Sequence, residues 1–202
     1  MPSSTASRAR VVVVTGPSGA GKGTLIQKLL RRVSGLEVAV SATTRGQRKG
    51  EEDGREYWFL TPEEFERRVQ GGDFLEWVEY VSGHRYGTLL SELDRIETHG
   101  NVCLLELETD GALRVLRKVP GAVTIFISAP ASELERRLTE RATESAGEIG
   151  ERVELARQQL AQAAAFDHVI ENDDVERAAD ELTELVEQLL VPSGHRDPSP
   201  HR

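Results

Sequence analysis

Gly16-Pro17-Ser18-Gly19-Ala20-Gly21-Lys22-Gly23-Thr24 is the stretch that decides the fold of this 202-residue chain. An apolar run at residues 11–14 precedes it, and apolar residues at helical spacing follow it over residues 25–30. The glycines therefore lie in a turn between a strand and a helix, which is the setting that a phosphate-binding loop requires. Glycine lets the backbone point successive N–H groups inward, and the N-terminus of the following helix adds positive potential. The stretch predicts a site for nucleotide phosphates.

Two side chains of this loop bear on the phosphates and on a metal ion. Lys22 supplies a mobile positive charge for the β- and γ-phosphates. The next residue is Gly23, where such loops normally carry a Ser or Thr hydroxyl for Mg²⁺, and here the hydroxyl comes one residue later, at Thr24. Either Thr24 takes a related role or the ion is held mostly through water, which Mg²⁺ tolerates.

Composition limits the kinds of partner that this chain binds. The formal net charge of −9 argues against nucleic acid and against an anionic membrane surface, and no stretch approaches the ~18 apolar residues of a membrane span. Cys103 is the single cysteine and lies in an apolar run, so we expect a buried, reduced thiol. The first nine residues lack the apolar core of a signal peptide, so we expect a cytoplasmic protein.

Short apolar runs alternate with helical patterns along most of the chain. The runs cover residues 11–14, 38–40, 102–107, 123–128 and 169–170. Buried strands separated by helices are typical of an α/β fold, with a parallel sheet and helices on both faces. Ligands of such sheets bind at the carboxyl ends of the strands, where the glycine-rich loop also lies.

Residues 41–88 depart from that alternation and predict an inserted antiparallel lobe. Two aromatic-rich runs, residues 55–60 and 74–80, flank a helix whose start is marked by Thr61, Pro62 and Glu64, the residues of a capping box with proline in the first turn.

The whole is expected to form one domain over residues 10–190. Its core is residues 10–40, 89–136 and 153–190, and the ends, 1–9 and 191–202, are expected to be disordered. The small, polar, glycine-containing residues 142–150 predict a mobile connection before a helix that resumes at residue 151.

Arg45 and Arg48 stand three residues apart in a loop that follows a predicted strand. Two planar guanidinium groups bind a phosphate bidentately better than lysines do. The alternative is that both arginines are solvated and pair with neighbouring acids, namely Glu51, Glu52 or Asp53.

Several short motifs resemble guanylate kinases in their order and spacing. They are GPSGAGKGT at 16–24, SATTR at 41–45 with Arg48 and Glu51 following, FLEW at 74–77, RYGT at 85–88, RRLTER at 136–141 and END at 171–173. Each motif is weak alone, but the ordered set is highly specific and covers residues 11–190. The resemblance implies a three-layer P-loop fold, a monophosphate-binding lobe at 41–88 and a mobile lid at 137–152. It also implies ATP and GMP as substrates, with Mg²⁺ as cofactor.

The resemblance implies an acceptor site for GMP in the lobe. The phosphate would be held by Arg45, Arg48, Tyr57 and Tyr86, with Glu51 beside them. The base would be bound by Ser41, Glu76 and Thr88, with Glu108 assisting. A buried carboxylate at Glu76 can accept hydrogen bonds from guanine N1–H and its N2 amine, and adenine has neither donor. The alternative for Glu76 is a solvent-facing strand carboxylate, and for Tyr57 and Tyr86 it is packing.

The resemblance also assigns ATP to the loop at residues 16–24 and to Asn172. Arg137, Arg141 and Arg152 would surround the transferred phosphoryl group when the lid closes, together with Lys22 and Arg45. The ordinary alternative for Arg137 and Arg141 is a solvated helix face.

The strand end at residues 106–111 and residue 142 depart from the family pattern, and for the acids of the strand end the alternative is a purely structural charge. Glu106 and Glu108 alternate to one side, and Glu106 joins Thr24 as a possible Mg²⁺ ligand through water. The family pattern has Asp at the position of Glu108, Gln at that of Asp110 and Gly at that of Ala142.

We therefore expect phosphoryl transfer from ATP to GMP, giving ADP and GDP. This reaction depends on positioning two anions and neutralising their charge, so no protein nucleophile or general base is required. One alternative is a kinase of the same fold that acts on another phosphorylated acceptor, such as a ribose phosphate. The other is a non-catalytic module that binds phosphorylated peptides. Glu76, Ser41 and Thr88 argue against the first, and Lys22 and the lid arginines argue against the second.

Overall fold

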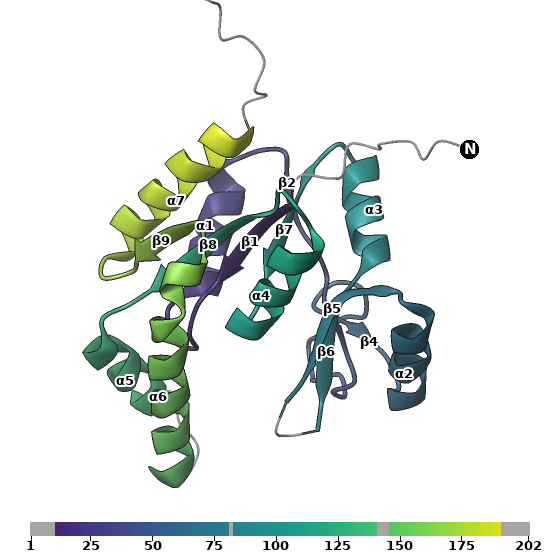
Figure 1. Ribbon diagram of the computed structural model, residues 1–202, viewed down its shortest axis with the longest axis horizontal. Coiled ribbons are helices and arrows are strands. Elements are labelled where there is room, and N and C mark those ends of the chain that lie inside the picture. The colour runs from purple at the N-terminus through teal and green to yellow at the C-terminus, as the bar shows by residue number, and fades with distance from the viewer. Residues whose placement is uncertain (1–10, 81–82, 141–145, 191–202) are drawn as a thin grey trace, which may run out of the picture.

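The computed structural model describes residues 11–80, 83–140 and 146–190. Five parallel strands form the central sheet (Figure 1). Their spatial order is β2 (Leu36–Val38), β7 (Val102–Glu106), β1 (Val11–Thr15), β8 (Val123–Ser128) and β9 (His168–Glu171). The expected α/β fold with a parallel sheet is confirmed. β2 begins two residues before the expected run at 38–40 and ends at Val38, after which the chain leads into the lobe.

Helices cover both faces of this sheet, and the valines of β1 show how. Val12 and Val14 pack with α1 (Lys22–Arg32) and α7 (Val175–Leu190), whereas Val11 and Val13 pack with α3 (Leu90–Thr98) and α4 (Thr109–Lys118). Successive side chains of a strand point to opposite faces, so an unbroken apolar run fits a strand buried on both sides. Each fully buried valine contributes about 1.5–3 kcal/mol of hydrophobic free energy.

The inserted lobe holds a second, four-stranded sheet. Its order is β4 (Trp58–Phe59), β3 (Ala42–Thr43), β6 (Arg85–Leu89) and β5 (Phe74–Glu79). β6 pairs antiparallel with β3 and β5, but β3 pairs parallel with β4. The expectation of an antiparallel lobe is therefore wrong for this pair. The long loop between β3 and β4 returns the chain to the start of β3, so the two strands run in one direction.

Helix α2 (Pro62–Gly71) packs on the lobe and begins as the sequence predicts. The Thr61 hydroxyl accepts a hydrogen bond from the Glu64 N–H at 3.1 Å, and the Glu64 carboxylate accepts one from the Thr61 N–H at 3.0 Å. This reciprocal capping box is confirmed. Phe65 of α2 stacks on Phe74 of β5, with ring centroids 4.4 Å apart.

The remaining helices are α5 (Ala131–Glu140), α6 (Ala146–Ala161) and the short η1 (Ala163–Ala165). α6 begins five residues before residue 151, so residues 146–150 are helical rather than part of a connection. Alanine and glutamate have high helix propensity and here outweigh the cost of two glycines. The rest of the expected connection, and the expected disordered ends, lie outside the described residues.

Two expectations from composition can be compared with the described residues. Cys103 is fully buried, and burial raises the pKa of its thiol to about 12. No helix within the described ranges has the length and apolar character needed to cross a bilayer.

Candidate active site

One cleft, of about 790 Å³, runs from the glycine-rich loop to the inserted lobe. In Figure 1 the lobe lies on one side of α4, and α5 and α6 lie on the other. The cleft brings together residues that the sequence assigned to donor, acceptor and metal, namely Lys22, Thr24, Ser41, Tyr57, Glu76, Tyr86, Glu106 and Glu108. Its volume is within the range of small-molecule sites.

The loop between β1 and α1 has a backbone that only glycine accommodates. Gly16 has φ 138°, and a Cβ there would lie 2.1 Å from the carbonyl oxygen of Ile127 in β8. Gly21 has φ 87°, and a Cβ there would lie 2.4 Å from Nδ2 of Asn172. The loop is therefore pressed against its neighbours, with its amides at the N-terminus of α1.

Lys22 is the first residue of α1, and its side chain reaches back to the start of this loop. Its Nζ donates hydrogen bonds to the carbonyl oxygens of Gly16 at 2.6 Å and Pro17 at 3.1 Å. Burial lowers the pKa of the Lys22 ammonium, and the negative charges of Glu108 and Glu106 oppose that shift. The ammonium is thus held within the loop, where it can reach a bound phosphate by exchanging these carbonyl contacts.

Two residues distant in sequence support the loop. Asn172 is 1% exposed and donates from Nδ2 to the carbonyl oxygen of Ala20 at 2.7 Å. Arg137 of α5 donates to the carbonyl oxygen of Gly19 at 3.2 Å and to the Glu133 carboxylate at 2.7 Å. The structure therefore places Asn172 behind the loop and Arg137 directly against it.

Arg45 pairs with Glu51, one of the three neighbouring acids that the sequence offered as partners. Its guanidinium donates to Glu51 at 2.8 Å and lies 5.3 Å from the centroid of the Tyr57 ring. The bond to Glu51 raises the pKa of Arg45, and the same bond lowers the pKa of Glu51. Glu51 also accepts a hydrogen bond from the backbone N–H of Arg48 at 2.8 Å. None of these three residues lines the cleft in the described part of the chain, but Arg45 contacts Tyr57, which does line it.

Glu76 is the buried carboxylate that the resemblance implies. It is 3% exposed, and its Oε1 accepts hydrogen bonds from the backbone N–H of Thr88 at 3.0 Å and from the Thr88 hydroxyl at 2.9 Å. Its Oε2 lies beside Gly111, where a Cβ would come within 3.0 Å of it. Burial raises the pKa of Glu76, while the bonds from Thr88 and the charges of Arg114 and Lys118 oppose that rise.

The carboxylates at the end of β7 have separate surroundings. Oε1 of Glu106 lies 3.9 Å from the place of a Cβ on Gly23, facing the start of α1. Desolvation in the cleft raises the pKa of Glu106, and the charge of Lys22 opposes this rise. Glu108 accepts a hydrogen bond from Gln159 of α6 at 3.3 Å.

A metal ion would have few protein ligands here. No group of three or more His, Cys, Asp or Glu side chains is placed to bind a metal among the residues that the structure describes. Glu106 and Thr24 both line the cleft and offer oxygen ligands, which suit Mg²⁺. Two protein oxygen ligands fit a Mg²⁺ ion whose remaining ligands are water and the phosphate oxygens of the nucleotide.

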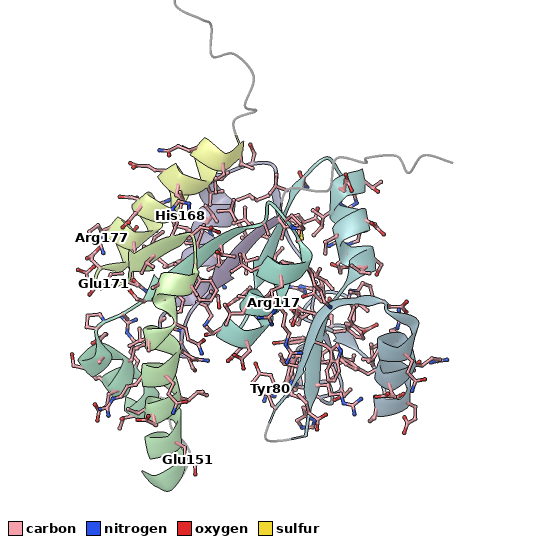
Figure 2. The ribbon with its side chains drawn as sticks, viewed as in Figure 1. Tyr80, Arg117, Glu151, His168, Glu171 and Arg177 are labelled. Atoms are coloured by element: carbon pink, nitrogen blue, oxygen red, sulfur yellow. The ribbon has the colours of Figure 1, made fainter. Side chains whose placement is uncertain are left out.

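Tyr80 is a cleft residue that the sequence analysis did not single out. It follows β5, and Figure 2 shows it on the side of the lobe toward the core helices. Its ring centroid lies 5.0 Å from that of Tyr86. Burial raises the pKa of Tyr80, and the charge of Glu108 and its hydrogen bond to Tyr80 add to the rise. The sequence offered one signal for this position. Alternate residues of a strand share a face, so residues 78 and 80 could have been assigned to the cleft together with Glu76, and all three do line it.

Two of the predicted lid arginines fall, wholly or by their side chains, outside what the structure describes. Arg141 lies outside the described residues. Arg152 belongs to α6, and its side chain is also outside what the structure describes.

Comparisons with known proteins find similarity over most of the chain. A family model described as guanylate kinase matches residues 8–189. A guanylate kinase of Rubrobacter xylanophilus is 47% identical over 185 residues, which are 91% of this chain and 96% of that protein. One from Streptococcus thermophilus is 43% identical over 182 residues, 89% of this chain and 87% of that protein. A crystal structure of guanylate kinase from Anaplasma phagocytophilum has a TM-score of 0.70 at 28% identity, covering 93% of this chain and 89% of that one.

Replacing Gly21 by alanine tests the role of the loop's shape. We expect the affinity for ATP, measured by calorimetry, to fall at least about tenfold, because the methyl group would displace Asn172 and the amides that face the phosphates. Gly35→Ala is the matched control, since Gly35 has φ 81° but nothing within 4 Å of its Cβ position. It should cost only about 1 kcal/mol of unfolding free energy. A folded Gly21→Ala variant with normal ATP affinity would contradict this account.

Proposed function

Because the chain belongs to the guanylate kinase family, we propose that its cleft transfers the γ-phosphoryl group of ATP to GMP, giving ADP and GDP. An oxygen of the GMP phosphate forms a bond to the γ-phosphorus while the bond to the leaving oxygen of ADP breaks. The observation that carries the proposal is the single cleft that holds both the phosphate loop and the buried Glu76. We expect the reaction in the cytoplasm.

The donor side of the cleft binds the phosphates of ATP. The amides of residues 19–23 and the N-terminus of α1 stabilise negative charge, and the Lys22 ammonium adds a full positive charge beside them. The contact of Arg137 with Gly19 supports a role for this guanidinium beside the transferred group. Developing charge in the transition state is stabilised by groups that are already oriented.

The acceptor side holds the phosphate of GMP among Arg45, Arg48, Tyr57 and Tyr86. Arg45 is oriented by Glu51 and by the face of Tyr57, so its guanidinium loses little freedom when a phosphate binds. The Tyr57 and Tyr86 rings meet edge to face with centroids 5.9 Å apart, and both line the cleft. Two anions are thereby brought together in one cleft.

The guanine base is selected by Glu76. Thr88 occupies one carboxylate oxygen and fixes the side chain, and the second oxygen accepts hydrogen bonds from guanine. Ser41 also lines this part of the cleft, and Glu108 lies at its core side. Adenine would leave a buried carboxylate without its partners, which is a large energetic penalty. A ribose phosphate, which has no base, would leave it in the same state.

Mg²⁺ would be held at the core side of the cleft by Glu106 and Thr24, in part through water. When bound it would neutralise phosphate charge between donor and acceptor. The charge of Lys22 opposes the rise that burial causes in the pKa of Glu106, which favours the ionised carboxylate that a metal ion binds.

A steady-state assay of ADP release tests the proposed reaction. With GMP, AMP and ribose 5-phosphate compared as acceptors, kcat/KM for GMP should exceed that for AMP by on the order of 10⁴-fold, because only guanine satisfies Glu76. Equal rates with all three acceptors, or no ADP release with GMP, would contradict the proposal.

Glu76→Gln tests the base-selecting carboxylate. The amide nitrogen would face guanine donors, so kcat/KM for GMP should fall on the order of 100-fold while KM for ATP stays unchanged. Glu63→Gln, at an exposed position on α2, is the matched control and should retain full activity.

Thermal unfolding separates this effect from a folding defect. Since burial raises the pKa of Glu76, the native state binds the proton more tightly, and stability is lost as pH rises from the unfolded pKa through the folded one. Glu76→Gln removes that ionisation and should be at least as stable as the wild type at pH 7. A variant that loses stability and GMP activity in parallel would contradict the assigned role.

A further inference from the structure

Glu92 is a buried carboxylate to which the proposed reaction gives no part. It is 2% exposed and lies in the first turn of α3, directly after β6 returns from the lobe to the core. It does not contribute to the described lining of the cleft. Burying a charge is costly unless hydrogen bonds satisfy it, so its partners show what it does.

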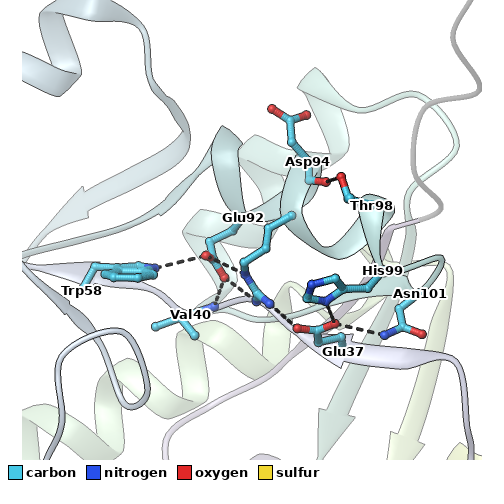
Figure 3. A network of polar contacts seen from close by, with 9 residues as sticks. Glu37, Val40, Trp58, Glu92, Asp94, Thr98, His99 and Asn101 are labelled. Atoms are coloured by element: carbon cyan, nitrogen blue, oxygen red, sulfur yellow. Dashed lines mark hydrogen bonds and ion pairs between the residues drawn. The ribbon is translucent and has the colours of Figure 1, made fainter.

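Each oxygen of the Glu92 carboxylate accepts one hydrogen bond from a residue outside α3 and one from Arg95 (Figure 3). Oε2 accepts from the backbone N–H of Val40 at 2.8 Å, and Oε1 accepts from the indole N–H of Trp58 at 3.1 Å. Arg95, one turn along α3, donates to both oxygens at 3.1 and 2.9 Å. The carboxylate is therefore fixed in position as well as neutralised.

The two partners outside α3 lie at the points where the lobe meets the cleft. Val40 is on the segment between β2 of the core and β3 of the lobe, and the next residue, Ser41, lines the cleft. Trp58 begins β4, and the preceding residue, Tyr57, lines the cleft. Glu92 thus fixes the residues next to Ser41, which is proposed to contact the base, and next to Tyr57, which is proposed to contact the phosphate.

The network continues into the core sheet through Arg95. Arg95 donates to Glu37 of β2, which also accepts hydrogen bonds from Asn101 at 3.0 Å and pairs with His99 at 2.9 Å. Burial alone would raise the pKa of Glu37, but the bonds from His99, Asn101 and Arg95 lower it to about 2. At neutral pH the network is a continuous series of ionised and hydrogen-bonded groups from β2 to β4.

We infer that Glu92 is a positioning residue for acceptor binding, which sets the lobe so that Ser41 and Tyr57 face the glycine-rich loop. The inference rests on the proposed function. An apolar residue at position 92 would leave the Val40 amide, the Trp58 indole and Arg95 without their shared acceptor, so the carboxylate is what directs these donors to one point. The carboxylate therefore orients these two segments of the lobe. Its loss should weaken the binding of GMP and leave the binding of ATP unchanged.

Glu92→Gln is the first variant of the test. The glutamine amide group would oppose the N–H donor of Val40 or those of Arg95, so the network loses at least one bond. KM for GMP should rise about tenfold, with KM for ATP unchanged and kcat changed by less than about threefold. Glu97→Gln, exposed on the same helix, is the matched control and should leave both KM values unchanged.

Trp58→Phe is the second variant, because it removes the indole donor and keeps an aromatic ring. It should raise KM for GMP by about threefold, again without an effect on ATP. In the double variant the two effects should be less than additive, because both substitutions disturb the hydrogen bonds around the same carboxylate.

Each outcome decides for or against the positioning role. A rise confined to KM for GMP in either variant supports it, and if Glu92→Gln does not fold, Trp58→Phe decides alone. Unchanged KM for GMP in the folded variants, or equal rises for GMP and ATP, would overturn it. A wild-type protein that does not phosphorylate GMP would overturn the proposed function itself, whereas normal wild-type kinetics with unaffected variants would overturn only the role of Glu92.

Discussion

The parallel pairing of β1 with β7 and β8 is the constraint on which the site depends. Val14 is aligned with Glu106, and Thr15 with Phe126, so the carboxyl ends of these strands reach the same edge of the sheet. The loop after β1 therefore meets the carboxylates after β7, and Gly16 passes within contact of β8. This edge is where ligands bind in parallel sheets, and here it forms the floor of the cleft.

The charged groups of the cleft are oriented before any substrate arrives. Lys22 is held by the carbonyls of its own loop, Arg45 by Glu51 and Arg137 by Glu133. Carboxylates thus hold the two arginines, and carbonyl oxygens hold the lysine. Groups that are already ordered lose less entropy on binding and respond at once to developing charge.

Local backbone requirements made the glycine-rich loop and the start of α2 predictable from sequence. Glycine spacing fixes the loop because Gly16 and Gly21 adopt φ values that other residues avoid, and the Thr61–Glu64 box fixes the start of α2. The buried Glu76 was also expected, although from the order of the family motifs and not from its own surroundings.

Features that depend on contacts distant in sequence were not predictable. The parallel pairing of β3 with β4 is set by a long loop, and each strand has only two residues, too few to show a direction. Glu92 sits in a helix whose sequence shows an ordinary acidic residue, and only the fold brings Val40 and Trp58 to it. The sequence could not identify the acid that pairs with Arg45, because Glu51, Glu52 and Asp53 are adjacent along the chain.

A crystal structure with GMP and a non-hydrolysable ATP analogue bound together tests the central claim most directly. The account predicts guanine N1 and N2 at hydrogen-bonding distance, about 2.7–3.2 Å, from the Glu76 carboxylate. It also predicts phosphates of the analogue on the amides of residues 19–23, with Nζ of Lys22 turned from the Gly16 and Pro17 carbonyls toward them. A guanine bound away from Glu76, or an analogue bound outside the glycine-rich loop, would contradict it.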